Sequence, residues 1–258
     1  MDTTTTTGPR GTTETSGPRV AIVTGGSRGI GRAVAERLAA DGLAVVLAYA
    51  GNTAAAQSAV DAITATGARA IAVQADVADE TAVAALFDRA EADLGGVDVV
   101  VHAAGQMALS PIVDLDLDQL DAMHRTNIRG TFVVAQQAAR RLRPGGALVN
   151  FSTSQVALRA PTYGAYAASK GAVEPLTLVL ARELRGRDVT VNAVAPGPTA
   201  TALFLDGKDD ATIEHLAQLA PLERLGQPED VAQVVAFLAS PAGHWVNGQT
   251  VRVNGGMI

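Results

Sequence analysis

The chain of 258 residues contains no cysteine and only four histidines. Without thiols it can form neither disulfide bonds nor thiolate metal sites. The four histidines lie far apart, without the short spacing that is typical of metal ligands. They are His102, His124, His215 and His244. We therefore expect no metal site in this protein.

Basic residues are also few, with 20 Lys and Arg against 26 Asp and Glu and a net charge of −6. A nucleic-acid-binding protein typically carries an excess of basic residues, and this chain has none. No apolar run approaches the ~18 residues that a membrane-spanning helix needs. We expect neither nucleic acid nor membrane as a partner, and a cytoplasmic location. Aromatic residues make up only 3% of the chain although 48% is hydrophobic, which predicts a core of small aliphatic side chains.

The first 17 residues differ from the rest in composition. A run of threonines, Thr3–Thr7, is followed by Gly, Pro, Ser and more Thr. This segment has no apolar stretch of the kind found in secretory signals, and too few apolar side chains to order itself. We expect a disordered tail over 1–17. Residues 18–258 contain no linker-like stretch, so we expect them to form one domain.

Short apolar segments alternate with amphipathic helical patterns after the tail. Strands are expected at 19–23, 43–48, 70–74, 97–103, 146–152, 189–195 and 250–253, and helices from residue 30 onward and at 52–66, 79–94, 117–142 and 163–186. Apolar strands joined by helical crossovers indicate a parallel sheet that is covered on both faces. The expected fold class is α/β, a single Rossmann-like, doubly wound, seven-stranded parallel sheet. Ligands of such sheets bind at the carboxyl ends of the strands.

A glycine-rich turn follows the first predicted strand, with the sequence Thr24-Gly25-Gly26-Ser27-Arg28-Gly29-Ile30-Gly31. Strand, glycine turn and helix start form the context of a dinucleotide fingerprint. Glycines let the backbone approach a pyrophosphate, and the helix N-terminus favours an anion. The spacing is Thr-Gly-x-x-x-Gly-x-Gly rather than Gly-x-Gly-x-x-Gly.

Tyr166 and Lys170 are four residues apart, which places them on one face of a helix. A phenol has an unperturbed pKa of about 10, and a neighbouring ammonium group lowers that pKa. The pair could therefore act as an acid and base near neutral pH. Alone this pair is weak evidence, because such pairs are common on exposed helix faces.

The glycine turn with Tyr-x-x-x-Lys far downstream resembles the short-chain dehydrogenase/reductase family, from about Pro18 to the C-terminus. Further matching segments are Asp76-Val77, His102-Ala103-Ala104-Gly105, Asn127, Pro196-Gly197-Pro198-Thr199 and Gly248–Gly256. The resemblance implies the catalytic residues Asn127, Ser154, Tyr166 and Lys170. It also implies contacts to the cofactor from Gly25, Ser27, Arg28, Gly29, Ile30, Gly31, Tyr49, Ala50, Gly51, Asn52, Asp76, Val77, His102, Ala103, Ala104, Gly105, Tyr166, Lys170, Pro196, Gly197 and Thr199. His102 stands where the family usually has asparagine.

Three hydroxyl residues compete for one family role after the fifth strand, where a hydroxyl polarises the substrate oxygen. Ser154 fits the Ser-x-x-Gly/Ala pattern with Ala157, whereas Thr153 has the commonest spacing from Tyr166. We choose Ser154 and leave Ser152 and Thr153 as alternatives.

The end of the second strand bears on cofactor choice. Enzymes that use NAD place an acidic residue there to bind the ribose 2′-hydroxyl. Here Tyr49 occupies that position, and no acid lies between Ala48 and Asn52. Arg28 could pair with a 2′-phosphate. We therefore expect NADP(H), with NAD(H) as the less favoured cofactor.

The predicted function is hydride transfer between NADP(H) and a ketone or secondary alcohol, with Tyr166 as the acid and base. The resemblance includes 3-oxoacyl carrier-protein reductases and other ketoreductases, and it implies a homotetramer or a homodimer. Residues 203–211 are expected near the substrate, and 203–208 among them are expected to form a mobile lid over it. The alternatives are a catalytically weak nucleotide sensor or scaffold, an NAD-dependent alcohol or sugar dehydrogenase, and a dehydratase or epimerase.

Overall fold

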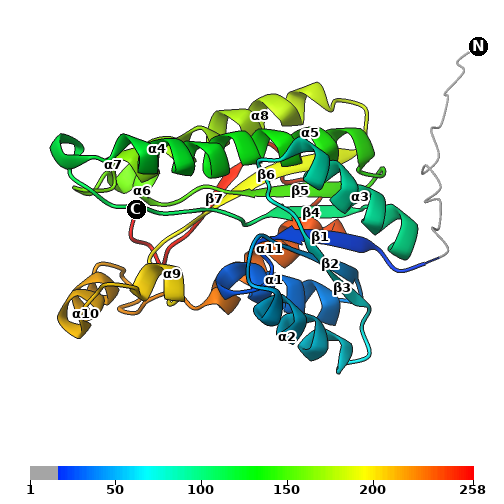
Figure 1. Ribbon diagram of the computed structural model, residues 1–258, viewed down its shortest axis with the longest axis horizontal. Helices are drawn as coiled ribbons and strands as arrows, with labels where there is room; N and C mark the ends of the chain where they lie inside the picture. The colour runs from blue at the N-terminus through cyan, green and yellow to red at the C-terminus, as the bar shows by residue number, and fades with distance from the viewer. Residues whose placement is uncertain (1–16) are drawn as a thin grey trace, which may run out of the picture.

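The computed structural model describes residues 17–258, so the tail expected over 1–17 lies, except for Gly17, outside the described residues. Seven parallel strands form one sheet in the order β3-β2-β1-β4-β5-β6-β7 (Figure 1). The strands are β1 (Val20–Thr24), β2 (Ala44–Tyr49), β3 (Ala70–Gln74), β4 (Val99–His102), β5 (Gly146–Phe151), β6 (Val189–Pro196) and β7 (Thr250–Val253). The expected fold class is confirmed.

Helices cover both faces of the sheet. One face carries α1 (Gly29–Ala40), α2 (Thr53–Thr64) and α11 (Pro228–Ala239), and the other carries α3 (Glu80–Leu94), α5 (Gly130–Arg141) and α8 (Val173–Glu183) (Figure 1). Successive strand residues point to opposite faces. Ala21 and Val23 accordingly join one hydrophobic core, whereas Val20 and Ile22 join the other.

Two long predicted helices are interrupted in the structure. The helix expected over 117–142 is α4 (Leu117–His124), a π-helical turn (Arg125–Arg129) and α5. The helix expected over 163–186 consists of α7 (Gly164–Gly171) and α8. The sequence did not lead us to predict α11, nor the short helices α6 (Gln155–Leu158), α9 (Ala202–Leu205) and α10 (Asp210–Gln218). Short 3₁₀ turns lie at Ile112–Asp114 and Pro241–Gly243.

The strand order places a topological switch point between β1 and β4. The chain runs outward from β1 to β3 on one side, then returns to add β4 beside β1 on the other. Such a crevice at the carboxyl ends of the strands is where ligands bind in this class of sheet. Helices α9 and α10 extend beyond that end, and the C-terminus lies near α9 (Figure 1).

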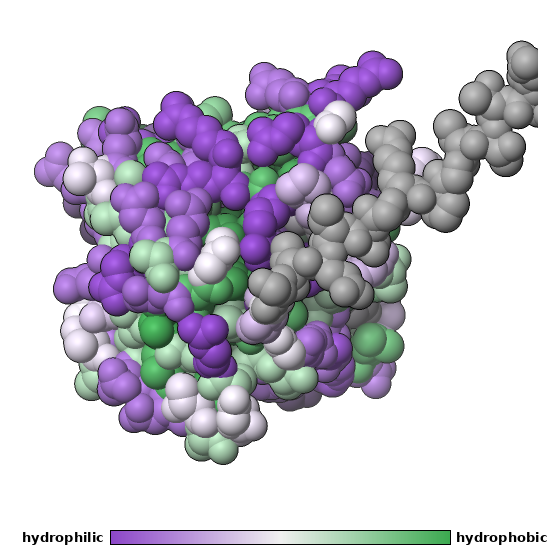
Figure 2. All heavy atoms as spheres, turned by 90° about the vertical axis from the view of Figure 1, so that its right-hand side faces the viewer, coloured by the Kyte–Doolittle hydropathy of each residue, from purple (hydrophilic) through white to green (hydrophobic). Residues whose placement is uncertain are grey.

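The opposite end of the molecule, where the strands begin, presents a mainly hydrophilic face with smaller apolar areas between the polar side chains (Figure 2). Among residues 17–258, none of the helices combines the length and the apolar character that a membrane crossing requires.

Candidate active site

A cavity of about 740 Å³ lies at the carboxyl ends of the strands. Nearly every residue predicted for the site lines it. They are Gly25, Ser27, Arg28, Gly29, Ile30, Gly31, Tyr49, Ala50, Gly51, Asn52, Asp76, Val77, Ala103, Ala104, Gly105, Ser154, Tyr166, Lys170, Pro196, Gly197 and Thr199. His102 and Asn127 are the two predicted residues that are buried behind its wall.

The glycine turn between β1 and α1 has no room for a side chain at Gly25 or at Gly31. A Cβ atom on Gly31 would lie 2.3 Å from the carbonyl oxygen of Gly25. Gly25 has a φ of +67°, and a Cβ there would lie 3.0 Å from the backbone of Ala104. Helix α1 begins at Gly29, within this turn, and its first N–H groups have no partner within the helix. This arrangement fits a dinucleotide pyrophosphate.

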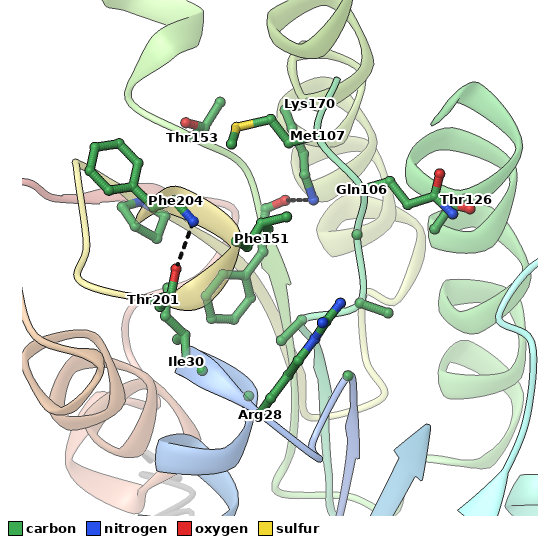
Figure 3. Close-up of a pocket in the computed structure, with 18 of the residues that line it drawn as sticks. Arg28, Ile30, Gln106, Met107, Thr126, Phe151, Thr153, Lys170, Thr201 and Phe204 are labelled. Atoms are coloured by element: carbon green, nitrogen blue, oxygen red, sulfur yellow. Dashed lines mark hydrogen bonds between the residues drawn. The ribbon is translucent and has the colours of Figure 1, made fainter. Parts of the chain in front are cut away.

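Besides Lys170, two cations and one carboxylate line the cavity, namely Arg28, Arg125 and Asp76. Arg28 reaches from the glycine turn into the cavity (Figure 3). Arg125, on the π-helical turn, donates to Asp76 at 2.6 Å. Burial alone would raise the pKa of Asp76, but bonds from the Ala78 N–H and Arg125 hold that pKa below its usual range. Asp76 is therefore ionised and paired with Arg125, and Arg28 forms no ion pair with any of the residues 17–258.

Tyr166 is the buried acid of the site. Burial raises the pKa of its phenol to about 12, a hydrogen bond with Thr153 opposes that shift, and Tyr163 adds to it. The rings of Tyr163 and Tyr166 meet edge to face, with 6.4 Å between centroids. Tyr166 therefore keeps its proton at neutral pH. The lowered pKa that the sequence suggested is not present in this structure, because burial outweighs the other influences and Lys170 is not among them.

Lys170 lies one turn beyond Tyr166 on α7. Its Nζ donates to the carbonyl oxygen of Phe151 at 3.0 Å, at the end of β5 (Figure 3). Burial lowers the pKa of Lys170 to about 8. At neutral pH most Lys170 side chains therefore carry their proton, and they release it more easily than an exposed lysine does.

Asn127 holds the loop after β4 against α7. Its Oδ1 accepts from the Gln106 N–H at 2.8 Å, and its Nδ2 donates to the Gln106 carbonyl at 2.8 Å and to Ser169 Oγ at 3.0 Å. The side chain is fully buried. The π-helical turn that carries it is a distortion often found at functional sites.

The hydroxyls after β5 do not face the same way. Ser154 Oγ donates to the Ala195 carbonyl at 3.1 Å and accepts from Asn254 Nδ2 at 3.1 Å. Thr153, in contrast, is the residue that bonds Tyr166. Ser152 Oγ donates to Glu174 at 2.8 Å. Ser154 is thus held by β6 and by the segment after β7, whereas its neighbour Thr153 faces Tyr166, so both hydroxyls stay candidates for the role predicted for Ser154.

Comparison with known proteins identifies the chain's relatives. The family model described as Enoyl-(Acyl carrier protein) reductase matches residues 25–258. A short-chain type dehydrogenase/reductase of Picea abies is 46% identical over 245 residues, covering 91% of this chain and 90% of that protein.

The chain belongs to the short-chain dehydrogenase/reductase family.

Other members of this family point to the same class of oxidoreductase. The chloroplastic NADPH-dependent aldehyde reductase-like protein of Arabidopsis thaliana is 42% identical, with 91% of this chain and 92% of that protein covered. A short-chain dehydrogenase from Burkholderia cenocepacia, solved in complex with NADP, is 40% identical with a TM-score of 0.87, covering 93% of this chain and 97% of that one.

His102 is where this chain departs from the usual family pattern. Its Nδ1 lies 2.9 Å from Thr24 Oγ1, which also accepts from the Ala104 N–H at 3.2 Å. The imidazole thus steadies the loop of Ala103 and Ala104 through Thr24, while its Nε2 is buried without a partner among the described residues. Burial, with a smaller effect from Lys170, lowers the pKa of His102 to about 3.

Some residues of the site were missed in the sequence. Arg125 and Thr126 line the cavity next to Asn127, and Tyr163, Phe204 and Met257 line it as well. Only Phe204 lay within a segment expected near the substrate. Arg125 is 49 residues from its partner Asp76 in sequence, so no local pattern indicates the pair.

Proposed function

We propose that this protein reduces the carbonyl group of a ketone with NADPH, and oxidises the corresponding secondary alcohol in reverse. The observation that carries the proposal is the contact between the Tyr166 and Thr153 hydroxyls beside Lys170, in a cavity that begins at the glycine turn. When bound, the nicotinamide supplies the hydride.

The chain's own residues supply the proton and hold the carbonyl. Tyr166, protonated at neutral pH, donates to the carbonyl oxygen as general acid. Thr153 donates a second hydrogen bond to that oxygen and stabilises the negative charge that develops there. Lys170 has a pKa of about 8 and lies one turn from Tyr166, which suits it to restore the proton. Asn127 fixes Gln106 at the cavity wall.

The preference for NADPH over NADH rests on charge. Tyr49 lines the cavity where an acid would repel a 2′-phosphate, and Arg28 projects into the same space. Asn52 uses its Oδ1 to cap α2 through the Ala55 N–H at 2.9 Å, which leaves its Nδ2 as a donor. Two relatives with NADPH or NADP in their names or titles support this choice.

Replacing Arg28 tests the cofactor proposal. Arg28→Ala should weaken kcat/KM with NADPH about tenfold or more while changing it little with NADH, because a charge-assisted bond contributes ~1.5–3 kcal/mol. Tyr49→Asp should shift the preference toward NADH. Steady-state kinetics of both variants with both cofactors give the answer. An equal effect of Arg28→Ala on the two cofactors would show that another group binds the ribose.

We further propose that the protein is a homotetramer in the cytoplasm. Phe132 on α5 is 56% exposed, and Val179 on α8 is 51% exposed. Apolar side chains on these neighbouring helices are suited to contact a second copy. Light scattering on the purified chain distinguishes a tetramer from a dimer or a monomer. Cell fractionation tests the location.

A further inference from the structure

A second cavity of about 260 Å³ adjoins the proposed substrate end of the main cavity. Its lining is mainly apolar. Leu216, Leu222, Val231 and Met257 are among its apolar residues, and Arg224 and Asp230 are its charged ones. The two charged residues neutralise each other, since Arg224 donates to Asp230 at 2.6 Å. The cavity therefore suits an uncharged, apolar group.

Pro198 and Met257 line both cavities, so they form the wall between them. The proline ring is rigid, whereas methionine has three rotatable side-chain bonds and adapts to irregular spaces. Met257 also follows two glycines with positive φ, Gly255 at +65° and Gly256 at +88°. The Met257 N–H donates a long hydrogen bond, 3.3 Å, to the Asn254 carbonyl. Met257 is thus the part of the wall that is able to move.

Two short helices border the two cavities in turn. Leu203 and Phe204 of α9 line the main cavity, and Leu216 of α10 lines the second. Gly207, with a φ of +71°, lies between the two helices. Figure 1 shows α9, α10 and the C-terminus together at this end of the molecule. Residues of α9 and α10 therefore border the two cavities on either side of the wall that Met257 helps to form.

We infer that Met257 is a gate and that the second cavity holds the distal apolar tail of an extended ketone substrate. This inference rests on the proposed carbonyl reduction, which it refines by naming the substrate class. The reacting carbonyl stays at Tyr166 in the main cavity. A short ketone fills only the main cavity and does not need the gate to open.

A series of straight-chain methyl ketones, from butanone to dodecan-2-one, tests the gate, because only the tail changes. Met257→Ala should raise kcat/KM for the long ketones at least about tenfold, since each newly buried methylene contributes roughly a factor of four. Butanone should change less than twofold. Adding Leu216→Trp, which fills the second cavity from α10, should remove the gain for the long ketones alone.

Ile258→Ala is the matched control, because Ile258 is the next residue and lines neither cavity. It should behave as the unmodified protein along the whole series. If Met257→Ala changes kcat/KM equally at every chain length, or does not change it at all, the proposal that Met257 is a gate is wrong. Calorimetric titration of the same ketones measures binding without turnover. If no ketone is reduced yet the long ones bind more tightly to Met257→Ala, the gate holds and the proposed reaction fails.

Discussion

Thr153 and Ser154 are neighbours, yet their hydroxyls lie in different surroundings. Thr153 bonds the phenol of Tyr166, whereas Ser154 is committed to Ala195 and Asn254. A hydroxyl with both its donor and an acceptor position in use has little left for a substrate oxygen.

Substitution separates the two hydroxyls. Thr153→Val keeps the shape of the side chain but removes its hydroxyl, and we expect kcat to fall about 10²-fold. Ser154→Ala should keep most of the activity and lose about 1 kcal/mol of stability from its hydrogen bonds. Turnover and urea unfolding of both variants provide the readouts. An active Thr153→Val enzyme beside an inactive Ser154→Ala enzyme would assign the role to Ser154 instead.

His102 makes stability depend on pH. Its pKa is about 3 in the folded protein, against 6.5 for an unperturbed histidine. The unfolded chain therefore binds more protons between these two values, so stability is complete above pH 6.5 and is lost as pH falls toward 3. At pH 5 the loss amounts to about 2 kcal/mol.

His102→Asn should remove this loss, because the amide does not titrate. Urea unfolding at pH 7.5 and pH 5 should show a drop in unfolding free energy that is about 2 kcal/mol smaller in the variant than in the unmodified protein. His215→Asn, at an exposed position on α10, is the control and should follow the unmodified protein. Parallel losses in all three proteins would contradict the buried neutral imidazole.

Sequence patterns predicted the site residues that depend on local geometry. The glycine turn and the Tyr166–Lys170 pair are spacings within one element, and the structure places both in one cavity. The orientation of Thr153 and Ser154 was not predictable, because it depends on Ala195 and Asn254, which are distant in sequence. The pKa of Tyr166 was not predictable either, because it depends on burial in the finished fold.

At the scale of elements, helix α1 depends on the glycine turn before it. Gly31→Ala would push a Cβ to 2.3 Å from the Gly25 oxygen, so the backbone would have to move. We expect a loss of ~1–3 kcal/mol in stability and weaker binding of NADPH. Gly171→Ala on α7 is the matched change, since the nearest atom would lie at 3.9 Å.

Gly171→Ala should stabilise the protein by ~0.5–1 kcal/mol, because alanine loses less backbone entropy in a helix. Chemical unfolding and a fluorescence titration with NADPH measure both variants. A Gly31→Ala protein that is as stable and binds as tightly as the unmodified chain would refute the close packing of the turn.

The elements that were missed were missed for different reasons. Helix α11 has apolar residues on most of its surface, buries Val231 and Val235, and packs on α1 and the sheet. Its exposed side carries Glu229, Gln233 and the apolar Phe237, so the helix has few polar positions that mark it in the sequence. The π-helical turn at Arg125–Arg129 contains the buried Asn127, and a regular helical period does not reveal such a turn.

At the scale of the whole molecule, the site exists because the sheet gathers loops from the entire chain. Residues from the turn after β1 to Met257 line one cavity, although they span nearly all of the described sequence. Apolar strands alternating with helices were sufficient to predict this arrangement, because parallel strands bring their carboxyl ends to a common edge. Which substrate fits depends on the side chains that line the cavity, and the pattern of strands and helices does not predict these.

The most direct test of this account is ketone-dependent oxidation of NADPH by the unmodified protein and by Tyr166→Phe. The substitution keeps the ring and removes only the proton donor. The account predicts turnover by the unmodified protein, a fall in kcat of at least ~10²-fold in the variant, and unchanged binding of NADPH. A Tyr166→Phe protein that reduces the same ketone at nearly the unmodified rate would contradict it.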